Sequence, residues 1–75
     1  MTPDRDPGIE PRPGDVLVKK KVFRTVVRIE QCLHVRVVCS QVIYRSGALH
    51  FFQIVPALSQ FRRWAAGAEV LERGA

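Results

Sequence analysis

Residues 22–30 read VFRTVVRIE and residues 33–40 read LHVRVVCS, and these two stretches decide the fold class. In each stretch, successive residues divide between two faces with a period of two, which is the geometry of a β-strand. β-branched residues dominate both stretches and favour strands over helices. The two stretches therefore predict an antiparallel β-hairpin with its turn near Gln31 and Cys32.

The alternation also predicts which side chains face the core. The predicted core face of the first stretch consists of Phe23, Thr25, Val27 and Ile29. The predicted core face of the second stretch consists of Leu33, Val35, Val37 and Cys39. A three-residue loop keeps these apolar sets on one side of the sheet. A loop at residues 31–33 would place Arg28 opposite Arg36, a like-charge pair that lowers stability. We therefore prefer a loop at residues 30–32, which places Arg28 opposite His34.

The flanking segments add further strands and one helix. Residues 16–18 and 49–55 are predicted strands, and Pro56 ends the second. Residues 42–45 form another strand or a continuation past a bulge, and Ser46-Gly47 marks a turn. Helical spacing then begins after Ala57, with a C-cap expected at Gly67. It is carried by Leu58, Phe61, Trp64, Ala65 and Ala68. Residues 68–72 fit either a last strand or more helix.

The predicted fold is mainly β with one short helix, arranged as a small, partly closed SH3-like barrel. The alternative is an α+β domain with an antiparallel sheet and a C-terminal helix. Residues 1–13 contain four prolines and are expected to be a disordered tail. Residues 14–72 form a single β-rich domain, and residues 73–75 a disordered end. A domain this small is marginally stable alone, so weak homo-oligomerisation is compatible with its size.

Positive charge concentrates in the body of the chain. Nine Lys and Arg residues stand against two Asp and Glu residues between positions 14 and 64, although the whole chain carries only +5. Such an excess attracts nucleic acid or an acidic protein. A solvated basic surface explains it equally well. The candidate nucleic-acid-binding residues, expected on a strand face opposite the core or at its end, are Lys19, Lys20, Lys21, Arg24, Arg28 and Arg36.

The remaining chemistry is sparse. Cys32, His34, Cys39 and His50 lack the paired spacing of a zinc site, and Cys39 fits a core position. The serines lack a nucleophile-elbow pattern, and no glycine-rich phosphate loop is present. We therefore expect that the protein is not an enzyme and that it binds no metal and no cofactor. The polar N-terminus and the lack of a long apolar run predict a cytoplasmic protein without membrane contact.

Two motifs resemble a group of short, uncharacterised bacterial proteins encoded in prophages and mobile elements. They are Pro13-Gly14-Asp15-Val16 and, at residues 58–64, LSQFRRW. The resemblance spans residues 13 to about 72 and implies the strand order of an SH3-like barrel. It departs from the group's pattern at Lys19-Lys20-Lys21, where the group has an acidic residue and a glycine turn. The resemblance implies no activity and no functional residues.

These observations predict a small, non-enzymatic binding module that binds nucleic acid through a basic strand face. The alternative is a protein–protein adaptor of phage or mobile-element type, which would use an aromatic surface or an exposed strand edge. Strong salt dependence of binding would favour the first, and an exposed apolar patch would favour the second.

Overall fold

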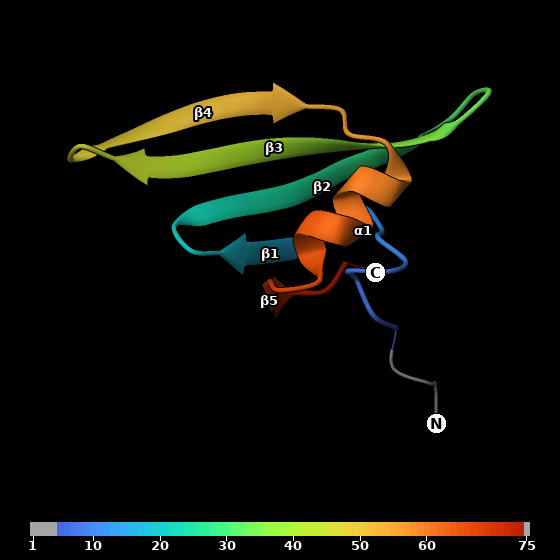
Figure 1. The fold of residues 1–75 in the computed structure, drawn as a ribbon, viewed down its shortest axis with the longest axis horizontal. Coiled ribbons are helices and arrows are strands. Elements are labelled where there is room, and N and C mark those ends of the chain that lie inside the picture. Colours follow the sequence, from blue (N-terminus) through green and yellow to red (C-terminus); the bar gives the residue numbers. More distant parts are fainter. Residues whose placement is uncertain (1–4, 75) are drawn as a thin grey trace.

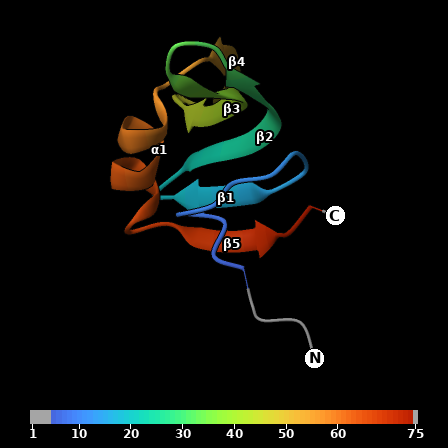
Figure 2. The same ribbon diagram turned by 90° about the vertical axis from the view of Figure 1, so that its right-hand side faces the viewer.

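The computed structural model describes residues 5–74 and contains one antiparallel sheet with a single helix against one of its faces (Figures 1 and 2). The elements are β1 (Val16–Lys19), β2 (Val22–Gln31), β3 (Val35–Arg45), β4 (Ala48–Ile54), α1 (Leu58–Ala65) and β5 (Glu69–Glu72). The strand order is β4-β3-β2-β1-β5. The mainly β prediction is confirmed.

The sheet is open, so the predicted partial closure into a barrel is wrong. β4 and β5 form its two edges and do not pair with each other. Residues 68–72, which the sequence left open, provide the edge strand β5 beside β1. In the part of the chain that the structure describes, no helix is long and apolar enough to cross a bilayer.

Two tight turns join the first four strands into hairpins. Lys20 and Lys21 connect β1 to β2, and Lys20 has a positive φ of 49°. Ser46 and Gly47 connect β3 to β4 with φ values of 55° and 77°. Two-residue hairpin turns often need left-handed backbone, which glycine adopts without a steric cost. The predicted turn at Ser46-Gly47 is confirmed, and residues 42–45 are the end of β3.

The β2–β3 hairpin differs from its prediction in register and in core face. Its three-residue loop is Cys32–His34, so Glu30 lies opposite Arg36 and Arg28 lies opposite Val38. The unlike charges of Glu30 and Arg36 suit this register. A register shift between Val26 and Arg28 marks a β-bulge, which reverses the alternation within β2. Val26 is therefore buried, whereas Phe23 and Val27, both predicted in the core, are exposed.

The core lies between α1 and one end of the sheet. Phe61 and Ala65 of the helix pack against Leu17, Val26, Val37 and Cys39. Leu58 and Trp64 of α1, with Ile29 and Ile54 of the sheet, extend this cluster at its margins. Figure 1 shows that α1 covers the end of the sheet near the β2–β3 loop and leaves the other end bare. The end of this face near the β1–β2 and β3–β4 turns is therefore not covered by the helix.

Residues 5–13 pack against the domain instead of extending from it as their prolines indicated. Pro7 and Pro11 are buried, and the backbone carbonyl of Ile9 accepts a hydrogen bond from Arg62 Nε at 2.8 Å. Residues 1–4 of the predicted tail and Ala75 of the predicted disordered end lie outside the described residues.

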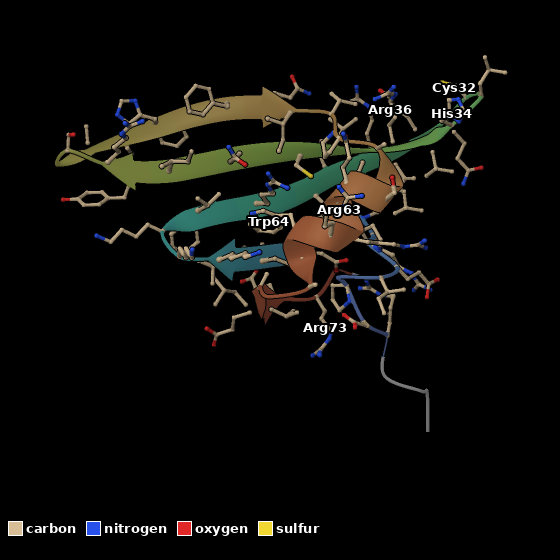
Figure 3. All side chains as sticks on the ribbon, in the orientation of Figure 1. Cys32, His34, Arg36, Arg63, Trp64 and Arg73 are labelled. Atoms are coloured by element: carbon tan, nitrogen blue, oxygen red, sulfur yellow. The ribbon has the colours of Figure 1, made fainter. Side chains whose placement is uncertain are left out.

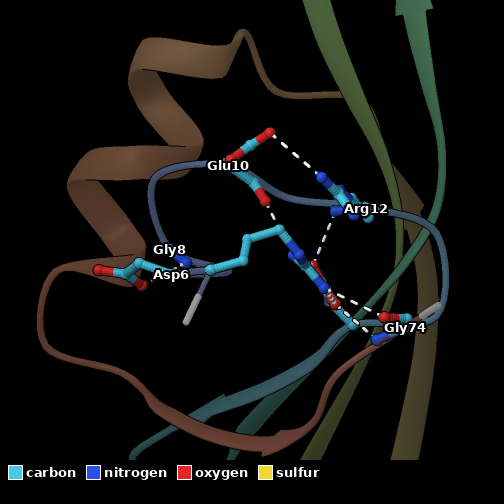
Figure 4. A network of polar contacts seen from close by, with 7 residues as sticks. Asp6, Gly8, Glu10, Arg12 and Gly74 are labelled. Carbon is cyan, nitrogen blue, oxygen red and sulfur yellow. Dashed lines mark hydrogen bonds and ion pairs between the residues drawn. The ribbon is translucent and has the colours of Figure 1, made fainter. Parts of the chain in front are cut away.

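The buried carboxylate of Asp15 is hydrogen-bonded to residues from both ends of the described part of the chain, in the polar network of Figure 4. Arg5 donates to its two oxygens at 2.6 and 2.7 Å, and the backbone N–H groups of Arg12 and Gly74 each donate at 2.7 Å. A Cβ on Gly74 would overlap the carbonyl oxygen of Pro13, so only glycine fits there. Burial alone would raise the pKa of Asp15, but these hydrogen bonds outweigh it and hold that pKa below its ordinary value.

We expect Asp15→Asn to lower the free energy of unfolding by roughly 3 kcal/mol at pH 7, because it leaves Arg5 without its anionic partner. The lowered pKa means that Asp15 stabilises the fold above its unfolded-state pKa and ceases to do so as the pH falls through the folded-state value. The deficit of the variant should therefore shrink in acid. Urea unfolding followed by Trp64 fluorescence from pH 7 to pH 2 measures both effects.

Glu10→Gln is the matched control, because the Glu10 side chain makes an exposed ion pair with Arg12 at 3.5 Å, and the backbone hydrogen bonds of Glu10 do not depend on its carboxylate. A variant Asp15→Asn that unfolds at the same urea concentration as this control would contradict the structural role of the carboxylate.

Candidate functional site

The structure does not bring the six predicted basic residues together. Lys19 and Arg24 lie on the side of the sheet that α1 covers, and Lys20 and Lys21 form the exposed β1–β2 turn. Arg28 and Arg36 lie opposite Val38 and Glu30, on the face away from the helix. Figure 3 shows Arg36 near the β2–β3 loop and away from Trp64. The predicted continuous basic strand face is therefore divided between two faces and a turn.

The two arginines on the outer face already have partners. Arg28 donates to the Oε1 atom of Glu30 from Nη2 at 2.9 Å and from Nε at 3.2 Å. Arg36 donates from Nη1 to the backbone carbonyl of Val55 at 3.3 Å. Both side chains are exposed, so water also solvates their charges. An anionic ligand would therefore add little to the stabilisation of either charge.

Arg24 has a different environment. Its guanidinium carbon lies 4.1 Å from the centre of a Trp64 ring, and its Nε donates to Gln41 Oε1 at 2.7 Å. The side chain is half-buried, and this burial lowers the pKa of the Arg24 guanidinium from its ordinary value. Within residues 5–74, no carboxylate forms an ion pair with Arg24. Arg24 is therefore a fixed, partly desolvated cation without an anionic partner in the described part of the chain.

The strand register places Arg24 between buried Leu17 of β1 and Gln41 of β3. Arg24 of β2 lies opposite Gln41 of β3, which lies opposite Phe52 of β4. Cross-strand partners project from the same face of a sheet. In the next row, Ile43 of β3 lies opposite His50 of β4. We call the resulting surface the Arg24 surface and define it by Lys19, Arg24, Gln41, His50, Phe52 and Trp64.

Helix α1 positions one border of the Arg24 surface. Lys19 Nζ donates to the backbone carbonyl of Trp64 at 3.1 Å, at the C-terminal end of α1. A cation there satisfies a carbonyl that the helix leaves free and also complements the helix dipole. Trp64 is in turn held by its contact with the Phe61 ring, whose centre lies 6.4 Å away. The helix therefore fixes both Lys19 and the indole against which Arg24 stacks.

The chemistry of the Arg24 surface suits anions that carry planar groups. A half-buried arginine has already lost part of its hydration, so an anion gains more from it than from a fully solvated cation. Phe52 is 49% exposed, and His50 beside it is also exposed. Flat exposed rings provide stacking platforms for planar ligands.

Gln41 and Trp64 are absent from the predicted site residues, although both contact Arg24. The sequence holds one signal for this grouping, since Gln41 shares the alternation of Val37 and Cys39 and therefore their face. The bulge in β2 hides the corresponding signal for Arg24. The residues around Arg24 in β2 are apolar on both faces of the strand, so alternation alone does not show which face is buried. Counting from Ile29 without the bulge assigns Arg24 to the outer face.

The cysteines and histidines form no cluster. Cys32 and His34 lie at the tip of the β2–β3 loop (Figure 3), whereas Cys39 is buried under α1. Within residues 5–74, no three His, Cys, Asp or Glu side chains are placed to hold a metal ion. A separate groove between residues 9–12 and the β2–β3 hairpin is lined by Ile9, Ile29 and Leu58, with Glu10 as its carboxylate.

Comparison of the chain with protein-family models, with curated proteins and with solved structures finds no match.

We expect the two cysteines to react with a thiol reagent at very different rates. Cys32 is exposed, whereas burial raises the pKa of the Cys39 thiol to about 11. The thiolate is the reactive form, and Cys39 is also shielded from solvent. Titration with Ellman's reagent at pH 8 should show one fast thiol in the native protein and two in urea. The variant Cys32→Ser serves as control, and a fast native reaction in that variant would contradict the burial of Cys39.

Proposed function

We propose that this chain is a small, non-enzymatic module that binds single-stranded nucleic acid through the Arg24 surface. The observation that carries the proposal is Arg24 itself, a half-buried cation that stacks on Trp64 and has no carboxylate partner among residues 5–74. The exposed rings of His50 and Phe52 lie on the same face of the sheet, two strands away. An anionic ligand would stabilise the charge of such a residue, and the aromatic side chains on the same face favour an anion that carries planar rings.

A phosphate group fits the charge requirement. Arg24 is held by the Trp64 ring and by Gln41, so its orientation is set before a ligand arrives. Preorganised donors lose less conformational entropy on binding. Lys20 and Lys21 in the neighbouring turn are exposed, and their charges extend the positive potential along a polyanion. This part of the surface accounts for phosphate contacts without sequence preference.

The aromatic side chains favour a single strand over a duplex. Phe52 and His50 lie in neighbouring rows on the same face, on the edge strand β4. Bases can stack on such rings only when they are not already stacked within a duplex. Cations that track the backbone beside rings that contact bases are the combination typical of non-specific single-strand binding.

The test is fluorescence anisotropy with labelled single-stranded and duplex oligonucleotides at several salt concentrations. We expect the single strand to bind more tightly, with affinity that falls steeply as salt rises. Arg24→Gln should lower the slope of log K against log salt by about 0.7, the value for one phosphate contact on a single strand. Phe52→Ala should weaken binding roughly tenfold through lost stacking and leave the slope unchanged.

Arg28→Gln is the matched control. It removes the same charge from the same strand, but on the outer face where Glu30 already pairs with Arg28. We expect its affinity to match that of the unaltered protein. If both glutamine variants lose affinity equally, the positive charge acts only as a diffuse field and the Arg24 surface is not the site. Absence of binding at low salt would refute the proposal.

A second candidate function is favoured by the outer face of the sheet. Phe23, Val42 and Phe51 follow one another across β2, β3 and β4 on that face, and Phe51 is 69% exposed. Val42 between the two exposed rings is only partly exposed, and an apolar row of this kind is a feature of protein-binding surfaces. An adaptor acting through this row would bind a protein partner with little dependence on salt, and Arg24→Gln would leave that binding intact.

The strand order supports a finer proposal about the fold. Four meandering strands, a short helix and a last strand beside β1 follow the strand order that the prophage resemblance implies. We propose that the domain is an open variant of the SH3-like arrangement, without its closure into a barrel. The same proposal includes an origin of this protein in a prophage or mobile element.

A further inference from the structure

Strand β4 leaves one edge of the sheet unprotected. It runs over seven residues, Ala48–Ile54, and within residues 5–74 it pairs only with β3. None of these residues is a proline, aspartate, glutamate, lysine or arginine, and all but Ile54 are exposed. An edge strand presents a row of unpaired backbone N–H and C=O groups, and proteins normally protect such a row with charge, proline or a cover. β4 has none of these devices along its length.

The opposite edge of the sheet is protected. β5 contains only four residues, Glu69–Glu72, and a glutamate lies at each end. Short length and charge both discourage pairing with another strand. The difference between the two edges indicates that the exposure of β4 is specific to that strand.

We propose that β4 pairs in antiparallel orientation with β4 of a second copy of this chain, so that two five-stranded sheets become one. A seven-residue strand pairs over its full length when the two-fold axis passes through its middle residue, which is Phe51. In this register Phe51 lies opposite Phe51 of the second copy, Leu49 opposite Gln53, and His50 opposite Phe52. Two-fold symmetry closes the assembly at two copies.

The composition of β4 is what makes a second copy a suitable partner. In a symmetric antiparallel pair, a charged residue on the axis would meet its own charge, which is destabilising. β4 contains no Asp, Glu, Lys or Arg, so no such repulsion arises. Phe51 is 69% exposed in the single chain, and pairing would bring two of these rings together at the axis. This inference rests on the strand edge and is independent of the proposed function.

Disulfide trapping tests the register directly. In a Cys32→Ser background, Phe51→Cys places two thiols opposite each other across the axis, with Cα atoms about 4.5–5.5 Å apart. This distance permits a disulfide. Leu49→Cys is the matched control, because it is on the same strand and the same face and is 55% exposed. Its symmetry mate lies four residues further along the partner strand, about 13 Å away.

We expect rapid disulfide-linked dimers with Phe51→Cys under mild oxidation and only slow collisional products with Leu49→Cys. Equal cross-linking of the two variants would overturn the proposed register. Buried Cys39 should remain outside the reaction.

Sedimentation velocity of the full chain provides the second measurement. The unaltered protein should shift from one copy to two as its concentration rises, and Phe51→Lys should remain a single copy because two ammonium groups would meet at the axis. Leu71→Lys, on the protected edge strand, should associate like the unaltered protein. A protein that stays a single copy at millimolar concentration overturns the proposal, as does loss of association in Leu71→Lys. If circular dichroism shows that Phe51→Lys is unfolded, the cysteine pair decides.

Discussion

The buried carboxylate of Asp15 is the constraint on which the arrangement of the chain ends depends. It lies at the start of β1 and accepts hydrogen bonds from Arg5, from the backbone of Arg12 and from the backbone of Gly74. Isolated charges are not stable in such a position, so the three donors are a condition of its burial. Through them, one side chain joins the N-terminal segment and the residues that follow β5 to the first strand of the sheet.

The second constraint is the β-bulge between Val26 and Arg28. Without it, Arg24 and Ile29 would lie on opposite faces of β2, since they are five residues apart. With it, Ile29 packs against the core while Arg24 lies on the same side, against Trp64. One inserted residue therefore serves both the packing of the core and the placement of a half-buried arginine on the open part of that face.

These two features mark how far the sequence could predict the structure. Period-two alternation identified the strands. The Ser46-Gly47 pair identified the β3–β4 turn, and the helical spacing of Leu58, Phe61 and Trp64 identified the helix. Each of these signals is local. The bulge leaves no local signal, because Val22, Val26, Phe23 and Val27 are apolar on both faces of β2. Arg5 and Gly74, which donate to Asp15, are distant from it in sequence, so local patterns could not predict the packing of residues 5–13 either. The contacts of Arg24 with Gln41 and Trp64 depend on both the register and the docking of α1.

The open sheet connects the two proposals. A closed barrel would pair β4 with β5 and would leave no free edge, whereas here the rings of His50 and Phe52 stand on the unpaired edge strand. In the proposed dimer, His50 of one copy lies opposite Phe52 of the other, so two Arg24 surfaces adjoin on one face of a continuous sheet. A single strand crossing that junction would contact the cations of both copies, and its salt dependence would reflect both. The two proposals can nevertheless fail separately, because Arg24 lies two strands from the edge and Phe51 projects from the opposite face of the sheet.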